Sequence, residues 1–149
     1  MEPRLNYASV SPEAAKSFGG AHHYIAHCGL EPGLIHLVYL RVSQINGCAY
    51  CVDLHMRDAL RDGDDFRRIN SVVTWRETPF FTPRERAALA WAESLTLVAE
   101  TRAPDEDYGR ARAEFSEKEL VDLTYAVALM NALNRVAIGF RKGPAAEAN

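Results

Sequence analysis

Apolar side chains recur along most of the chain at the three- and four-residue spacing of an amphipathic helix. Two stretches show this clearly, one with Leu34, Leu37, Val38, Val42 and Ile45, the other with Leu120, Leu123, Val127, Met130, Leu133 and Ile138. Such spacing turns one face of a helix toward a core. Strict alternation and hairpin turns, which mark β-strands, are absent from the sequence. The pattern predicts an all-α fold, with one domain over residues 1–149.

Polar caps and prolines mark the ends of these predicted helices. Ser11-Pro12 places an N-cap residue before a proline at the first helical position, and residues 82–85 and 116–119 are capping boxes. We expect helices over residues 12–28, 32–45, 49–61, 64–75, 83–100, 104–115 and 117–138, and a frayed tail over residues 141–149. Residues 34–42 would also suit a buried strand, but their length and lack of alternation favour a helix.

Composition and charge narrow the functional classes. The chain has 149 residues, 48% of them hydrophobic and 25% charged, which is enough to bury a core and typical of a globular protein. A net charge of -3 argues against a nucleic-acid or anionic-membrane surface. The first residues lack the apolar segment of a signal peptide, and no apolar run approaches the ~18 residues of a membrane span. We therefore expect a cytoplasmic protein without nucleic-acid or membrane partners.

The strongest chemical signal is the segment 47–55, Gly-Cys-Ala-Tyr-Cys-Val-Asp-Leu-His. On a helix, Cys48, Cys51 and His55 would follow one another a turn apart. A helix N-terminus or an adjacent histidine lowers the pKa of a thiol from ~8.5 and so favours the nucleophilic thiolate. A peroxide would oxidise one thiolate to a sulfenic acid, and the second thiol would then close a disulfide. Three cysteines do not make a secreted disulfide framework, so this disulfide would be transient and catalytic.

Other interpretations of the same motif stay open at this point. Zinc could bind the two thiols and His55, with a remote histidine such as His36 as the fourth ligand, although a second CxxC is missing. A thioredoxin-like motif would need a strand before it, where this chain predicts a helix. The two cysteines could also be plain core residues beside a surface histidine.

Residues 37–55, 75–80, 85–93 and 131–135 together resemble the alkylhydroperoxidase D-like proteins of the carboxymuconolactone decarboxylase superfamily, in its short single-domain branch. The resemblance covers about residues 30–141, and its most specific part is the CxxCxxxH run with the helix before it. It implies an all-helical fold, a homo-oligomer (trimer or hexamer) and a peroxidase with an antioxidant role. We expect no cofactor and no metal.

The resemblance also implies a role for each residue of the motif. Cys51 maps to the cysteine that the hydroperoxide substrate oxidises to a sulfenic acid. Cys48 maps to the proton donor and resolving thiol, and His55 to a member of the proton relay. A dithiol reductant, such as a lipoyl protein or a thioredoxin-like partner, would then restore the two thiols.

Two positions depart from the family pattern. His36 stands where the relay usually has a glutamate, and Tyr50 stands where a histidine often lies between the cysteines. A histidine can carry a proton, with an unperturbed pKa of ~6.5 against ~4.3 for glutamate. It cannot supply the negative charge that would hold His55 protonated. We keep His36 as a candidate relay residue, with a core histidine bonded to a backbone carbonyl as the alternative.

Two rival functions also fit the family or the motif. One is a cofactor-free decarboxylase of the carboxymuconolactone type, against which the intact CxxC argues. The other is a non-enzymatic redox sensor or adaptor.

Among the remaining residues, Asn131 and Asn134 are interpreted chiefly as polar contacts between helices or subunits, and Arg41 as a helix-face charge that could lie near a thiolate.

Overall fold

Helices form the framework of residues 2–145, the part of the chain that the computed structural model describes. In chain order they are α1 (Tyr7–Val10), α2 (Pro12–His27), α3 (Pro32–Asn46), α4 (Ala49–Arg61), α5 (Phe66–Asn70), the 3-10 helix η1 (Ser71–Glu77), α6 (Pro83–Thr96), α7 (Val98–Thr101), α8 (Asp105–Glu114) and α9 (Glu117–Gly139). No strand occurs within residues 2–145, so the predicted all-α fold is confirmed. Residues 1 and 146–149 of the predicted domain and tail lie outside the described residues.

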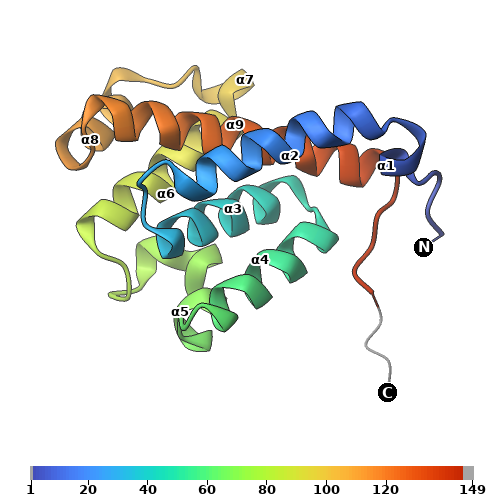
Figure 1. Cartoon of the computed structure of the whole chain (residues 1–149). Helices are drawn as coiled ribbons and strands as arrows, with labels where there is room; N and C mark the ends of the chain where they lie inside the picture. Colours follow the sequence, from blue (N-terminus) through green and yellow to red (C-terminus); the bar gives the residue numbers. More distant parts are fainter. Residues whose placement is uncertain (1, 146–149) are drawn as a thin grey trace.

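Helix α3 is the centre of the packing (Figure 1). Its side chains are apolar on most of its circumference, and Leu37, Val38 and Val42 are fully buried. A helix of this kind is stable only when neighbours cover it on several sides. Helices α4, α6 and α9 provide that cover. In Figure 1, α2 lies along α9 at the top and α4 runs below α3.

The predicted helix over residues 64–75 is wrong in its second half. Asp65 caps α5 by accepting a hydrogen bond from the N–H of Arg68, but α5 ends at Asn70 and the chain continues as the 3-10 helix η1. Within η1 the backbone of Thr74 leaves the helical region (φ -119°, ψ 28°). This break lets the indole N–H of Trp75 donate to Glu93 at 2.9 Å. A tertiary contact thus overrides the local helical pattern.

The predicted helix over residues 83–100 is also interrupted. It begins as expected with the capping box of Thr82 and Glu85, but Leu97 (φ -98°, ψ 29°) separates α6 from the short α7. Just before this break, the hydroxyl of Thr96 donates a hydrogen bond to the backbone carbonyl of Ala92. Such a side-chain bond competes with the regular backbone hydrogen bonds of a helix. The other predicted capping box, at Ser116 and Glu119 before α9, is confirmed. None of the helices in the described part is long and apolar enough to cross a membrane.

Candidate active site at the turn between α3 and α4

The CxxC motif lies at the sharp turn that joins α3 to α4. Gly47 ends α3 with a left-handed backbone (φ 70°, ψ 31°), which glycine adopts without the steric cost of a side chain. Cys48 then forms the N-cap of α4. Its N–H donates to the carbonyl of Ser43 at 3.0 Å, and its own carbonyl accepts from Val52 at 2.9 Å. The turn therefore holds Cys48 at the positive end of the α4 dipole, as the sequence predicts.

Both motif cysteines are free thiols in the core, with 1% of Cys48 and 5% of Cys51 exposed. A hydrogen bond from the Cys51 thiol, backbone N–H groups of Cys51 and Tyr50, and the Asn134 amide lower the pKa of Cys48 to about 7, against the opposing effect of burial. The pKa of Cys51 is raised, because its proton is held by Cys48 and its surroundings are apolar. The first thiolate therefore forms on Cys48, and near neutral pH the two sulfurs share one proton.

His55 follows Cys51 by one turn of α4 and is 4% exposed. Its ring packs against the ring of Tyr39 with centroids 5.0 Å apart. Burial lowers the pKa of His55 to about 4; the charge of Asp58 opposes this effect, while His36 and His22 add to it. His55 is therefore neutral at pH 7, in the form that accepts a proton.

His36 lies near His55 but is partly exposed and paired with a carboxylate. Its Nε2–H donates to Asp62 Oδ2 at 2.8 Å. The alternative of a core histidine bonded to a backbone carbonyl is therefore wrong for this ring nitrogen. Both His36 and His55 line a cavity of about 250 Å³, together with His22 and Tyr39. The structure thus brings the predicted relay residues to one cavity, and it adds Asp62, which the sequence pattern did not single out.

A group of amides fixes α9 against the turn. Asn46 donates to Asn131 and to Asn134, each at 3.0 Å, and Asn134 donates to the Ser43 hydroxyl at 3.1 Å. The predicted contact between helices is confirmed. Asn134 is fully buried, and its amide also lies close enough to both sulfurs to lower their pKa.

Lys142 is a site residue that sequence reasoning missed. Residues 141 and 142 do not fray: the N–H of Lys142 donates to Ala137 at 2.9 Å, and its ammonium lies 4.0 Å from the ring centroid of Tyr50. Its charge acts to lower the pKa of Cys51. No local signal marks this residue, because it meets the motif only after α9 has folded back over α4. Arg41, by contrast, does not have this role, because its guanidinium forms an ion pair with Glu93 at 2.7 Å.

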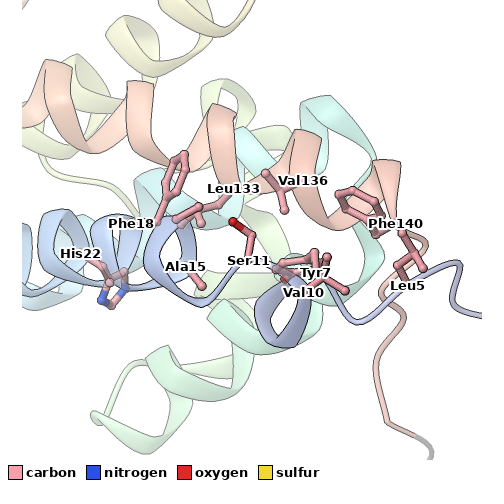
Figure 2. A pocket seen from close by; sticks show the side chains of 12 residues that line it. Leu5, Tyr7, Val10, Ser11, Ala15, Phe18, His22, Leu133, Val136 and Phe140 are labelled. Atoms are coloured by element: carbon pink, nitrogen blue, oxygen red, sulfur yellow. The ribbon is translucent and has the colours of Figure 1, made fainter.

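A second, apolar cavity of about 480 Å³ lies between the N-terminal helices and the end of α9. Figure 2 shows Phe18 and Leu133 on its wall and His22 at one end. Phe18 and Leu133 also pack against the core cluster that contains the two motif cysteines. His22 lines both cavities. The sequence pattern did not indicate either cavity, since their walls come from segments far apart in the chain.

Metal binding at the motif receives no support from the geometry. Between residues 2 and 145, no group of three or more histidine, cysteine, aspartate or glutamate side chains is placed to hold a metal ion. Cys48, Cys51 and His55 follow one another along α4, but they do not converge as a ligand set.

Comparison with known proteins places this site in a family. The family model described as "Carboxymuconolactone decarboxylase family" matches residues 12–94, from α2 through most of α6. The chain belongs to this family. A relative, the uncharacterized protein YdfG of Bacillus subtilis (strain 168), is 36% identical over 138 residues, covering 93% of this chain and 94% of its own length.

Solved structures agree with the assignment. An Agrobacterium tumefaciens protein of unknown function, described as a "Putative Antioxidant Defence Protein AhpD", is 44% identical with a TM-score of 0.96, over 98% of this chain and all of its own. The debrominase Bmp8 is 21% identical with a TM-score of 0.80, over 93% of this chain and 74% of its own, and shares the fold. This member of the carboxymuconolactone decarboxylase family thus has the AhpD-like helical fold. Both the fold and the superfamily agree with the prediction from the sequence motifs.

Proposed function

We propose that this protein is a thiol peroxidase that reduces hydroperoxides through a dithiol–disulfide cycle of Cys48 and Cys51. The observation that carries the proposal is the placement of two free, buried thiols at the N-terminus of α4, with Cys48 as its N-cap and Cys51 in its first turn, one turn before the buried His55. A thiolate is the nucleophile that peroxides require, and a second thiol at this spacing resolves the product. The similar Agrobacterium tumefaciens protein, described as a "Putative Antioxidant Defence Protein AhpD", supports an antioxidant role.

The proposed cycle balances in atoms and electrons. The proton of Cys51 passes to Cys48 or His55, and the Cys51 thiolate attacks the outer peroxide oxygen, which breaks the O–O bond. The products are a Cys51 sulfenic acid and an alcohol, whose oxygen takes up the proton. The Cys48 thiolate then attacks the Cys51 sulfur and an S–S bond forms. The S–O bond breaks and releases hydroxide, which takes a second proton from solvent and leaves as water. An external dithiol, of the lipoyl or thioredoxin-like class, reduces the disulfide by exchange and becomes a disulfide itself.

Cysteine variants test the proposal directly. One equivalent of hydrogen peroxide is expected to lower the protein mass by two hydrogens and to cross-link Cys48 to Cys51. The Cys48→Ser variant is expected to accumulate a sulfenic acid on Cys51, detected as a dimedone adduct, while Cys51→Ser should lose all turnover. The third cysteine, Cys28, is a free thiol at the C-cap of α2, outside the motif. Cys28→Ser is therefore the matched control and should behave as the parent. An unchanged thiol count after peroxide would refute the proposal, and lactone decarboxylation retained without either motif cysteine would support the decarboxylase instead.

We also propose that the outer face of α2 and α9 is covered by further copies of this chain. Tyr24, Val121 and Tyr125 are exposed apolar side chains on that face. Two shallow cavities adjoin there and share Val121 and Tyr125 in their walls. A continuous exposed apolar surface is typical of a protein interface. Because the chain resembles family members that form trimers or hexamers, we propose a second copy of this chain as the partner on this face.

A further inference from the structure

The apolar cavity between the N-terminal helices and the end of α9 has no part in the proposed dithiol chemistry. Its volume is about 480 Å³, within the range of about 300–1,000 Å³ that is typical of small-molecule sites. Apart from Ser11, Gly19 and His22, the residues of its wall are aliphatic or aromatic, and Leu5 and Val10 among them are exposed. Exposed apolar side chains around a hollow favour an apolar occupant that removes them from water.

The cavity is elongated along α2. Its wall runs from His22 at one end to Leu5 and Phe140 at the other (Figure 2). On α2 and its N-cap alone the wall extends from Ser11 to His22, a length of about 16 Å at the helical rise of about 1.5 Å per residue. A long hollow with apolar walls suits an extended alkyl chain better than a compact polar molecule.

Two cations stand at the Phe140 end of the cavity. The Arg4 backbone N–H donates to the Phe140 carbonyl at 3.0 Å, and the Arg4 guanidinium donates to the Gly139 carbonyl at 2.9 Å. The Lys142 ammonium lies 5.8 Å from the ring centroid of Tyr7, which is part of the wall. Between residues 2 and 145, neither cation pairs with a carboxylate. This end of the cavity therefore attracts an anion.

The backbone after α9 fixes the position of Lys142. The N–H of Arg141 donates to the Ile138 carbonyl at 3.1 Å, and the N–H of Lys142 donates to the Ala137 carbonyl at 2.9 Å. These two bonds are those of a Schellman motif, which requires a left-handed residue just after the helix. Arg141 adopts that backbone (φ 54°), although a residue with a side chain does so at a steric cost. The turn therefore holds Lys142 beside the cavity.

We propose that this cavity binds a medium-chain carboxylate amphiphile, with the alkyl chain along α2 and the carboxylate beside Lys142 and Arg4. The apolar wall supplies most of the affinity, because each methylene group that leaves water is stabilised. The two cations supply the preference for a carboxylate over an uncharged head group. Neither motif cysteine lines the cavity, so this binding site does not depend on the proposed peroxidase activity.

Isothermal titration calorimetry of the full-length protein with decanoate, below its micellar concentration, measures the binding. We expect saturable binding of one decanoate per chain. The uncharged analogue 1-decanol should bind about fivefold more weakly, because it loses the contribution of an exposed ion pair. Hexanoate, which has the same head group on a shorter chain, should bind at least about tenfold more weakly than decanoate, because it buries less apolar surface.

Two neighbouring glycines of α2 provide a matched pair of variants. Gly19 lines the cavity, whereas Gly20 does not, and a Cβ added at either position meets no atom within 4 Å. Gly19→Leu should fill the cavity and weaken decanoate binding at least about tenfold, whereas Gly20→Leu should bind decanoate as the parent does. Both changes replace a glycine inside a helix with a better helix former, so both variants should keep the fold.

Lys142→Met tests the charged end of the cavity. It should weaken the binding of decanoate about fivefold and leave the binding of 1-decanol unchanged. The matched control is Lys16→Met, which removes another exposed lysine, on α2; it should leave the binding of both compounds unchanged.

The outcomes separate this proposal from its rival and from the peroxidase. No binding of decanoate by the parent, or equal binding by Gly19→Leu and Gly20→Leu, overturns the proposed site. Equal affinities of the parent for decanoate and 1-decanol overturn the carboxylate preference. If decanoate does not bind and Gly19→Leu alone lowers the mass measured by light scattering, the cavity is instead an interface between copies of this chain. The peroxidase proposal is decided separately, by the thiol count after peroxide.

Discussion

The neutral, buried state of His55 makes the stability of this protein depend on pH in a calculable way. In the unfolded chain the histidine has its ordinary pKa of 6.5, and in the folded protein burial lowers the pKa to about 4. Between these values the unfolded state binds the extra proton, so acid favours unfolding. The sign is that of a depressed pKa: the contribution of His55 is complete above pH 6.5 and is lost as the pH falls toward 4. The loss amounts to about 2 kcal/mol at pH 5 and about 3 kcal/mol at pH 4.

The perturbation that isolates this effect is His55→Gln, which removes the titrating ring and leaves a neutral polar side chain. Urea unfolding at pH 7.5, 6 and 5, at one fixed protein concentration, gives the free energy of unfolding for parent and variant. All carboxylates titrate equally in both proteins, so the difference between the two curves reports His55. We expect the parent to lose about 2 kcal/mol more than the variant between pH 7.5 and pH 5.

His23→Gln is the matched control, because His23 lies on the exposed side of α2. Its stability curve should run parallel to that of the parent. Parallel curves for His55→Gln as well would refute the reasoning, since they would mean that His55 keeps an ordinary pKa in the folded protein and is not the neutral base beside Cys51.

Three further predictions test the surroundings of the motif. Lys142→Met removes the cation that acts to lower the pKa of Cys51, so alkylation of Cys51 by iodoacetamide in the Cys48→Ser background should slow by about twofold, whereas Arg141→Met in the same background should leave the rate unchanged. Asn134→Ala strands buried partners on α3 and should lower the free energy of unfolding by about 2 kcal/mol in urea titrations; a change near zero would contradict the buried amide group. Tyr125→Asp places a charge on the exposed apolar face of α9 and should lower the mass measured by light scattering, while Phe66→Asp, on α5, should not; equal masses for both variants would remove that face as the interface.

Local patterns were sufficient for most of the fold. The helices that follow residues 11, 82 and 116 begin where the sequence predicts. At residues 82 and 116 a capping box, which is a contact within four residues, sets the start, whereas the Ser11 side chain makes no capping hydrogen bond before α2. The predicted helices are wrong where contacts with distant segments override the local pattern. Trp75 leaves its predicted helix to reach Glu93, and α6 stops at Thr96, next to hydroxyl contacts with the preceding turn.

The candidate site divides in the same way. Cys48, Cys51 and His55 lie within eight residues of one another, so the periodicity of a single helix places them together, and sequence was enough to name them. His36 was named for its place in a family pattern, but its partner was not. Its partner Asp62 lies at the end of the next helix, and only the antiparallel packing of α3 on α4 brings the two side chains to 2.8 Å.

By itself the sequence determined that this protein is all-helical and that it carries a dithiol and a histidine at the start of a helix, since these are properties of spacing along one segment. Only the tertiary structure decided which groups surround that dithiol. Burial makes His55 neutral, α9 brings Asn134 to the sulfurs, and the chain after α9 lays Lys142 over Tyr50. The burial of a group and the charges around it depend on neighbours from distant segments, so they are set only once those segments have packed.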